Sequence, residues 1–536
     1  MKHVPAVRSL ILPAIILLAV AVIAPSHLFA QSRTGTIRGT ITDPSGAAIP
    51  GARVTVTNAA TNVSQSSVTN EVGIFVVPFL PPGKYVIAAE KDGFKSLRRS
   101  GITLQVSDSL TIDLALELGG TAERVDVEAT APLVNASNAS LGQVIENRRI
   151  VELPLNGREP FALAALSPGV LPPPAAGFVH LGGSVPSING ASNFTSEVTV
   201  DGMPNTTPRN AGRNNFLIYT PSVDAVAEFK VETNSLSAEF GRFNGGVISV
   251  VMKSGTNDWH GSAYHFHRNS AFDANSFFNN RAGLPLGALR RNQFGFTLGG
   301  PVRIPKLYNG RDRTFFFIDY EGFREAQLAN STFTVPTAIE RAGDFSQTRT
   351  SSGALITIYD PMTNRQVNGN WVRSPFPGNI IPADRISPVS RRLVDYYPLP
   401  TNNRLVGNLD VTSSRRNITD TGDVRIDHNI SERNRLFGRY SIQYPFVGEP
   451  NFYGNIANPT NPPLTQRRHS FTLQDTITVS PTLIVNINYG IVRMFGTRTA
   501  WSDGFDVTTI GMAENLRDGQ QVRAIPVVSI SGMSGL

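Results

Sequence analysis

The stretch VTVDGMPN at Val198–Asn205, with AEFGRFNGGVISVVMKSGTN at Ala238–Asn257, divides this sequence into its parts. The first stretch is a short β-forming run that ends in an Asp-Gly turn at Asp201 and Gly202. The second joins a glycine pair to an unbroken β-forming run, and a series of alternating strands begins directly after it, near Trp259. We therefore predict a boundary between two differently built domains at about residue 257.

Seven segments beyond this boundary alternate apolar and polar residues with the period of two that β-strands require. They are Gly261–Arg268, Gln293–Gly299, Thr314–Phe323, Asp423–His428, Arg435–Tyr444, Ser470–Val479 and Leu483–Arg493. Their connections alternate between long and short, and the extremes are Arg324–Gly422 and Ser480–Thr482. Long surface loops opposite short turns are typical of outer-membrane barrels, so we predict a partial transmembrane antiparallel β-barrel over residues 258–536.

Composition excludes several classes of function. The 536 residues contain no cysteine, which removes disulfides and thiolate metal sites. The net charge of +7 comes without a dense basic block, so we expect no nucleic-acid partner. Nucleotide-binding glycine fingerprints and a nucleophile elbow are absent, so we expect no enzyme, no catalytic residue and no cofactor. The histidines near Trp259, His265 and His267, are predicted to be a polar pair facing the barrel lumen, not a metal site.

The N-terminus is predicted to be an export signal. Lys2, His3 and Arg8 form a short basic region, Leu10–Ile23 is apolar, and a small residue, Ala30, precedes the expected cleavage point. We therefore predict a Sec signal peptide at residues 1–30 and an exported chain. An apolar stretch of about 18 residues, which a spanning helix needs, does not follow in the sequence.

Short alternating strands separated by glycine and proline turns predict a β-sandwich over residues 31–120. This segment resembles the carboxypeptidase regulatory-like domain, through Gly35, Gly39, Asp43, Gly73, Phe75, Leu80, Pro82, Gly83 and Tyr85. The resemblance implies an accessory, carbohydrate-binding-like fold, serving either sugar binding or a structural or protein-contact role. A zinc peptidase is excluded because the segment contains no histidine.

The central and C-terminal parts resemble Oar-like TonB-dependent outer-membrane receptors. The resemblance rests on LPLNGR at Leu153–Arg158, on the stretches quoted above, on FGFTLGGPVRIP at Phe294–Pro305 and on RTFFFIDYEGFRE at Arg313–Glu325. It implies a mainly β chain with an N-terminal β-sandwich, a linker and α/β plug domain at residues 121–257, and then the barrel. Such barrels have about 22 strands, so we expect a product truncated within the barrel, or a fragment.

The resemblance also implies site residues. The plug motif is Asp201, Gly202, Glu239, Arg242, Gly245 and Gly246, with Glu239 and Arg242 expected in the salt-bridge set that locks plug to barrel. A candidate TonB box, the segment that a TonB-type periplasmic energy transducer binds by strand addition, contains Glu123, Val125 and Val127. An ordinary strand or linker is the alternative for this segment.

The function implied is an outer-membrane receptor that is embedded in lipid and imports a bulky nutrient, with oligosaccharide or peptide as candidates. Ligand-stacking aromatic residues are expected in the longest loop, at Tyr359, Trp371, Tyr396 and Tyr397. The alternative is a non-transporting surface or adhesion protein built on the same barrel. In that case the N-terminal sandwich would be a carbohydrate- or protein-binding module.

Overall fold

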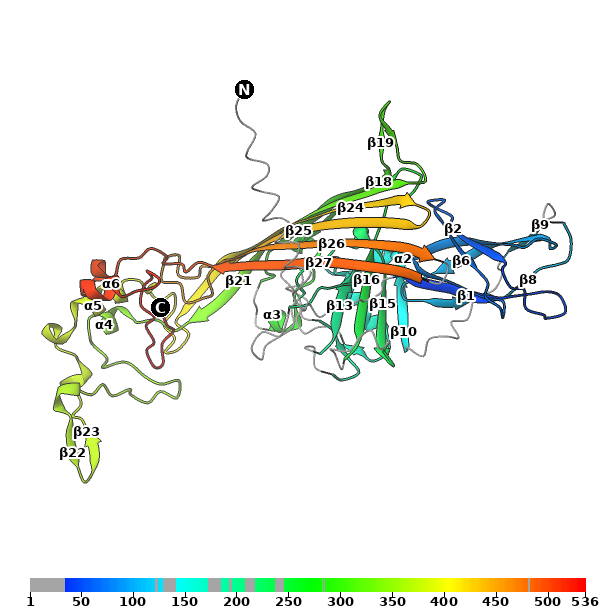
Figure 1. Cartoon of the computed structure of the whole chain (residues 1–536). Coiled ribbons are helices and arrows are strands. Elements are labelled where there is room, and N and C mark those ends of the chain that lie inside the picture. The colour runs from blue at the N-terminus through cyan, green and yellow to red at the C-terminus, as the bar shows by residue number, and fades with distance from the viewer. Residues whose placement is uncertain are drawn as a thin grey trace.

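The computed structural model describes residues 34–120, 124–128, 141–171, 185–191, 195–207, 217–236, 245–281, 283, 285–480 and 483–536. The predicted signal peptide lies outside them. Three parts follow one another along the chain: a small β-sandwich, a mixed central domain and a long curved sheet with large loops (Figure 1). Within the described residues, no helix is long and apolar enough to cross a membrane.

The sandwich consists of two sheets with an apolar core between them. Its strands are β1 (Gly35–Thr42), β2 (Arg53–Asn58), β3 (Ser64–Val68), β4 (Ile74–Leu80), β5 (Gly83–Glu90), β6 (Ser96–Leu104), β7 (Ser109–Thr111), β8 (Leu114–Ala115) and β9 (Arg124–Glu128). One sheet has the order β4-β1-β7, with β8 also on β1, and the other has the order β3-β2-β5-β6-β9. Alternate residues of these strands point inward, so Ile37, Val54, Phe75 and Ile87 are fully buried.

The sandwich sheet continues past residue 120, where the sequence predicted its end. Strand β9 lies parallel to β6, with Val125 beside Leu97 and Val127 beside Arg99. The boundary was set too early because β9 contributes backbone pairing but no residue of the buried core.

We expect a fragment of residues 34–128 to fold alone with a cooperative thermal transition, because its core is complete without the rest of the chain. A fragment of residues 34–120 should also fold, with a slightly lower melting temperature, since every core residue precedes position 117. Calorimetry of the two fragments checks this. A gradual melt of the longer fragment would contradict it.

The central domain is a five-stranded mixed sheet with short helices on it. Its order is β10 (Leu141–Glu146), β15 (Val226–Asn234), β16 (Val247–Met252), β13 (Glu197–Val200) and β14 (Met203–Pro204). Around it lie α2 (Asn147–Glu152), η1 (Pro160–Leu166), η3 (Val223–Ala225) and the strand pair β11 (Val170–Leu171) and β12 (Ser187–Ile188). Phe161 and Phe229 lie in its core, and Phe317 of the long sheet packs into that same core. We call this domain the plug.

The long sheet has seven strands in chain order, each antiparallel to its neighbours. They are β17 (His260–Asn269), β18 (Leu289–Pro301), β21 (Thr314–Phe333), β24 (Leu409–Ser431), β25 (Asn434–Gly448), β26 (Leu464–Ser480) and β27 (Leu483–Arg498). The mainly β fold and all seven predicted strands are confirmed. β21 and β24 are much longer than predicted, and they leave residues 334–408 as the loop. The predicted strands were too short because both faces of β21 and β24 have polar residues near the long loop, so the alternation of apolar and polar residues stops there.

The loops and short turns lie at opposite ends of this sheet. The sandwich and the hairpin β19 (Arg303–Ile304) to β20 (Tyr308–Asn309) are at one end, on the right in Figure 1, and we call it the lower end of the sheet whatever its place in the view. At the other, upper end are the loop hairpin β22 (Arg365–Val367) to β23 (Asn370–Val372), the helices α4 (Ala338–Arg341) and α5 (Pro388–Val394), and the C-terminal helix α6 (Glu514–Asp518). The helix α3 (Phe277–Arg281) lies in the loop between β17 and β18.

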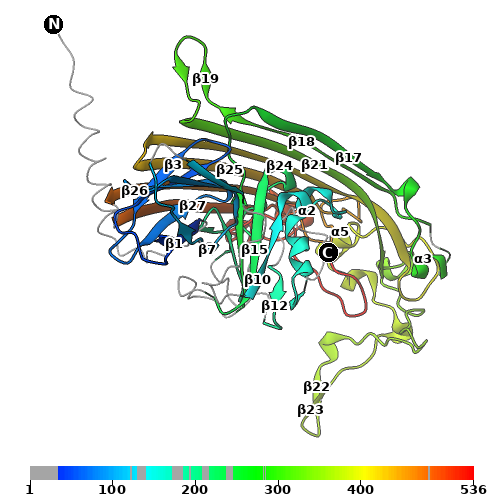
Figure 2. The same cartoon turned by 90° about the vertical axis from the view of Figure 1, so that its right-hand side faces the viewer.

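The plug lies against the concave face of the sheet (Figure 2). Polar side chains of β21, β24, β25 and β26 point toward it and are buried, while their apolar neighbours point outward. The prediction for β17 was wrong in this respect. Tyr264 faces the plug, and the register places His265 opposite Phe294 on the outer face. Both sets of alternating residues in β17 are half polar, so contact with the plug decides which set faces inward.

Candidate functional site at the plug–sheet interface

The Asp-Gly turn of the plug presents a carboxylate to the sheet. Asp201 and Gly202 both have positive φ, 50° and 77°, and they join β13 to β14 as a two-residue hairpin turn. The Asp201 amide donates to the carbonyl of Val250 at 2.9 Å. The Met252 amide donates to Asp201 Oδ1 at 3.2 Å. The turn therefore fixes this side chain toward the strands.

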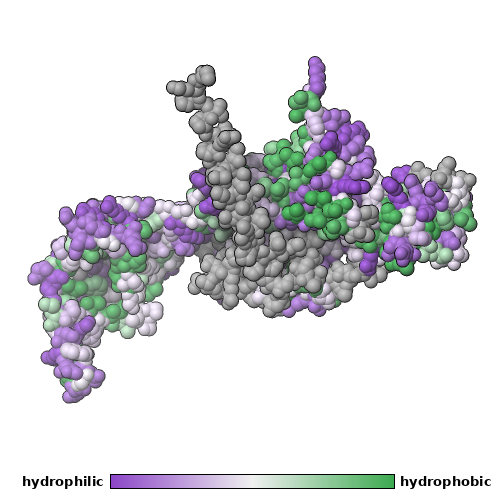
Figure 3. All heavy atoms as spheres, in the orientation of Figure 1, coloured by the Kyte–Doolittle hydropathy of each residue, from purple (hydrophilic) through white to green (hydrophobic). Residues whose placement is uncertain are grey.

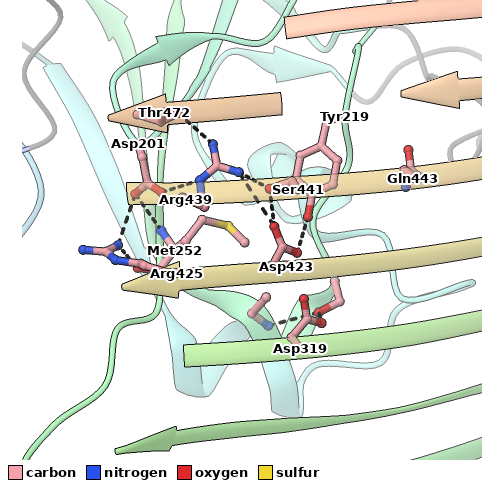
Figure 4. A network of polar contacts seen from close by, with 12 residues as sticks. Asp201, Tyr219, Met252, Asp319, Asp423, Arg425, Arg439, Ser441, Gln443 and Thr472 are labelled. Carbon is pink, nitrogen blue, oxygen red and sulfur yellow. Dashed lines mark hydrogen bonds and ion pairs between the residues drawn. The ribbon is translucent and has the colours of Figure 1, made fainter. Parts of the chain in front are cut away.

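Two arginines of the sheet meet that carboxylate (Figure 4). Arg439 Nε of β25 lies 2.8 Å from Asp201 Oδ2, and Arg425 Nη1 of β24 lies 3.5 Å from Asp201 Oδ1. Arg425 also donates to the Met252 carbonyl at 3.0 Å, and it pairs with Asp427 at 2.7 Å. Arg439 is only 1% exposed and Asp201 is fully buried. Plug and sheet are thus joined by opposite charges that are removed from water.

The same network continues along the sheet. Asp423 accepts hydrogen bonds from Ser441 and from the phenolic hydroxyl of Tyr219 in the plug. Arg439 Nη1 lies 3.7 Å from Asp423 Oδ1, which links the second carboxylate to the first. Beside it, Ser222 of the plug donates to Asp319 of β21 at 2.6 Å. Plug side chains therefore meet three neighbouring strands through one buried set of contacts, which we call the interface network.

A second contact joins the start of the plug to the first strand. Arg158, the last residue of the LPLNGR stretch, pairs with Asp224 within the plug. Its guanidinium lies over the rings of Tyr264 and Phe266, at 4.8 and 4.2 Å from their centroids. Tyr264 in turn donates to Glu321 at 2.8 Å. This arrangement explains why the aromatic residues of β17 face inward.

The glycine pair of the plug motif allows close approach of two segments. A Cβ at Gly245 would lie 2.6 Å from Ser196 Oγ, and one at Gly246 would lie 2.6 Å from the Glu232 carbonyl oxygen. The Gly246 carbonyl also accepts from the amide of Glu197, the first residue of β13. Both positions therefore need a residue without a side chain.

We expect Gly246→Ala to destabilise the plug by about 1–3 kcal/mol, since overpacking of a close backbone contact costs that much. Gly120→Ala is the matched control, because a Cβ there meets no atom within 4 Å. Urea unfolding of the full chain measures both variants. Equal midpoints for the two would contradict the close-packing role.

The other predicted site residues differ in whether the structure describes them and in how exposed they are. Glu239 and Arg242 lie outside the described residues, as does Glu123. In the loops, Trp371 on β23 is 69% exposed and Tyr359 is 52% exposed. Tyr397, by contrast, is only 4% exposed because it packs with Tyr453 and Leu409 in a core of the loops themselves, so it cannot stack on a ligand.

Tyr396 is half-buried and packs edge-on against Phe505, so it too is partly used within the loops. Sequence reasoning missed the sheet side of the interface network, Arg425, Arg439 and Asp423. The only signal in the sequence was that β24 and β25 carry charged residues at alternate positions between apolar ones, which indicates a polar inward face but not its partners.

The sandwich contacts both the plug and the lower end of the sheet. Arg435 Nη2 of β25 donates to Gln65 Oε1 and to the Phe79 carbonyl, each at 2.9 Å, beside a cavity of about 110 Å³. On the plug side, the Val106 amide donates to the Glu228 carboxylate, and Lys230 donates to the Ser107 carbonyl at 3.3 Å. These polar contacts hold the sandwich below the plug.

Contact between sandwich and plug is expected to strengthen on acidification. Burial raises the pKa of Glu228 from 4.5 to about 7, and the nearby Asp108 and Glu146 add to this, while the hydrogen bond from the Val106 amide and the charge of Lys230 act in the opposite direction without cancelling it. A raised pKa means that the docked state favours the protonated acid. The contribution of Glu228 to the docked state is therefore fully present below about pH 4.5 and is lost as the pH rises through about 7.

Two cysteines introduced at Glu71 of the sandwich and Glu152 of the plug, both exposed, can carry spin labels for a distance measurement, because the chain has no other cysteine. We expect a narrow distance distribution at pH 5 and a broader one at pH 8. Glu228→Gln should keep the narrow distribution at both pH values. The same pH response in that variant would assign the effect to another group.

Comparison with known proteins agrees with this architecture. The family described as outer membrane beta barrel domain matches residues 251–536, and the carboxypeptidase regulatory-like domain matches residues 36–117. The TonB-dependent transporter Oar of Myxococcus xanthus is 28% identical over 308 residues, which are 55% of this chain and 27% of that protein. This chain thus spans about a quarter of the length of the curated relative.

Two solved structures show lower similarity. The outer membrane transporter YddB from Escherichia coli is 12% identical, with a TM-score of 0.41 over 68% of this chain and 40% of that one. Chlorocatechol 1,2-dioxygenase from Pseudomonas putida is 16% identical, with a TM-score of 0.14 over 16% of this chain and 61% of that one. The dioxygenase covers too little of the chain to suggest an activity.

The Oar match therefore agrees with the resemblance read from the sequence, and that relative is named as a transporter. The matched family covers more than half of the chain, including all seven strands of the long sheet. The chain belongs to the outer membrane beta barrel domain family and has a carboxypeptidase regulatory-like domain before its plug.

Proposed function

We propose that the protein is a TonB-dependent receptor that binds a bulky nutrient at the cell surface and imports it across the outer membrane. The observation that supports this most is the buried ion pair between Asp201 and Arg439 in the interface network. A buried ion pair is often no more stabilising than an apolar contact of the same size. Its advantage is that it opens when water or a competing charge enters, as a plug that must move requires.

The ligand proposed is an oligosaccharide or a peptide. Trp371 and Tyr359 offer exposed aromatic faces in the loop at residues 334–408, at the upper end of the sheet. Aromatic faces suit the apolar face of a sugar ring or a peptide side chain. The sandwich, at the opposite end, is proposed as a contact module for the periplasmic side.

The energy source proposed is a TonB-type transducer that binds the segment around Val125 and Val127. This segment already forms a strand, β9, at the edge of the sandwich sheet. Strand addition needs a segment that is extended and has one side available for pairing.

Uptake of fluorescent oligosaccharide and peptide mixtures by cells expressing the whole gene product tests the proposal. We expect accumulation that stops when an uncoupler is added, while binding at the surface persists. Accumulation that is insensitive to the uncoupler would overturn the proposal.

A surface-adhesion role is the second candidate, and one observation favours it. The β22–β23 hairpin, with Trp371 exposed, projects far from the sheet (Figure 2). An adhesin should retain cells on a coated surface and should not accumulate any of the labelled compounds. Loss of retention in Trp371→Ala, without any uptake in the parent, would favour this role over transport.

A further inference from the structure

Arg468 of β26 is a buried cation without a carboxylate beside it. The side chain is 0% exposed. Its Nη1 donates to Gln443 Oε1 at 2.8 Å, and its Nη2 donates to Gln466 Oε1. It forms no ion pair with any described residue, whereas Arg425 and Arg439 each contact two carboxylates. The guanidinium of Arg468 is therefore held out of water by neutral partners only.

The side chains around Arg468 are uncharged. Its cross-strand neighbours are Gln443 of β25 and Met494 of β27. On the plug side lies Thr220, whose carbonyl accepts from Gln443 Nε2 at 3.1 Å. Gln443 lies on the same strand as Arg439 (Figure 4). Arg468 therefore adjoins the interface network but shares none of its carboxylates.

The outer face of the sheet does not compensate this charge. Phe471 and Ile491, opposite each other on β26 and β27, are exposed there, and hydrophobic residues gather over the middle of the outer face (Figure 3). Such a zone fits the hydrocarbon layer of the membrane. A charge buried between an apolar zone and the plug is strongly unfavourable unless an opposite charge accompanies it. Arg468 thus needs an anion that the described part of the chain does not supply.

Hydrogen-bond donors remain for such an anion. A guanidinium has five N–H donors, and the two contacts to glutamine use two of them. Nε of Arg468 is buried and has no partner among the described residues, and the same holds for the hydroxyl of Thr220 in the plug. Both residues contact Gln443, one from the sheet and one from the plug. These donors surround the same amide and suit an anion, not a metal ion.

We propose that Arg468 binds a small monovalent inorganic anion, of the size of chloride, between the plug and the sheet. A small ion fits because the surrounding side chains already bury the guanidinium completely. One negative charge neutralises one guanidinium, whereas sulfate would leave a second charge buried. The bound ion links β26 to the plug at Thr220, in addition to the interface network. The site is independent of whether the protein imports a ligand.

Hydrogen exchange of the full chain in detergent micelles tests the proposal, in sodium chloride, bromide and gluconate of equal ionic strength. The reporters are the amides of Ile218 and Tyr219, which are hydrogen bonded to Asn205 within the plug, next to Thr220. We expect these amides to exchange about tenfold more slowly in chloride than in gluconate, when chloride is at about ten times its dissociation constant. Bromide should act like chloride. Equal exchange of the parent in all three salts would overturn the proposal.

Three variants assign the effect to Arg468. Arg468→Met should abolish the difference between salts, and in gluconate it should protect the reporter amides at least as well as the parent, because it removes a buried charge that has no partner. Arg468→Lys keeps the charge and should keep part of the difference. Arg467→Met is the matched control, since Arg467 is exposed on the other face of the same strand, and it should respond like the parent. A full chloride response in Arg468→Met, or its loss in Arg467→Met, would contradict the assignment.

Discussion

Replacing Arg439 with methionine is expected to destabilise the contact between plug and sheet by about 3–5 kcal/mol, which is the usual cost of removing one partner of a buried ion pair. The substitution keeps the volume of the side chain but leaves Asp201 and Asp423 buried without their shared cation. Of its two arginine contacts, Asp201 then retains the longer one, to Arg425 at 3.5 Å. The plug should therefore open locally far more often.

Hydrogen exchange of the full chain measures this effect. We expect faster exchange in β13, β14 and β16, which surround Asp201, and unchanged exchange in the sandwich. Arg433→Met is the matched control, because Arg433 is exposed in the turn between β24 and β25. Adding Asp201→Asn to Arg439→Met should restore part of the protection, since it removes one of the stranded charges. Unchanged exchange in Arg439→Met would show that the pair does not hold the plug.

The second large effect is expected from proline in β9. Val125→Pro or Val127→Pro removes a backbone donor and fixes φ, so strand addition by a partner should fail. Purified periplasmic domain of a TonB-type transducer should bind the parent chain and lose about tenfold or more in affinity for either variant, if two or three strand hydrogen bonds of about 0.5–1.5 kcal/mol each are lost.

Gly120→Pro is the control for this experiment, because it lies in the same segment just before the strand. The sandwich core is complete before residue 117, so its melting temperature should change little in all three variants. Unchanged transducer binding in both valine variants would rule out this segment as the contact. Equal loss in Gly120→Pro would mean that linker geometry, not strand pairing, matters.

The sequence predicted the strands well where one face meets lipid. In β25, Tyr440 and Ile442 alternate with Arg439 and Ser441, and that contrast is strong enough to give both the strand and its inward face. In β17 the contrast fails, because Tyr264 and Phe266 are apolar yet face inward, where the guanidinium of Arg158 covers them. A contact from a residue more than 100 positions away cannot be read from local alternation.

The candidate site was only partly predictable for the same reason. Asp201 and Gly202 predict a tight turn from local sequence alone, since both residue types tolerate positive φ. Their partners are far away in sequence, and Arg439 became a partner only because the fold places β25 opposite that turn. Tyr397 is the converse case: an aromatic residue in a long loop suggests a ligand, but the loop is large enough to have its own core.

The position of Asp201 has a consequence for how the contact between plug and sheet can change by mutation. It must satisfy a backbone requirement, a φ of 50°, and supply the negative charge for Arg439. Asparagine and glycine meet the first requirement but not the second. In the genetic code each is a single base away from either aspartate codon. One nucleotide change can therefore weaken the plug contact while the hairpin stays intact, so the ease of opening can vary separately from the fold.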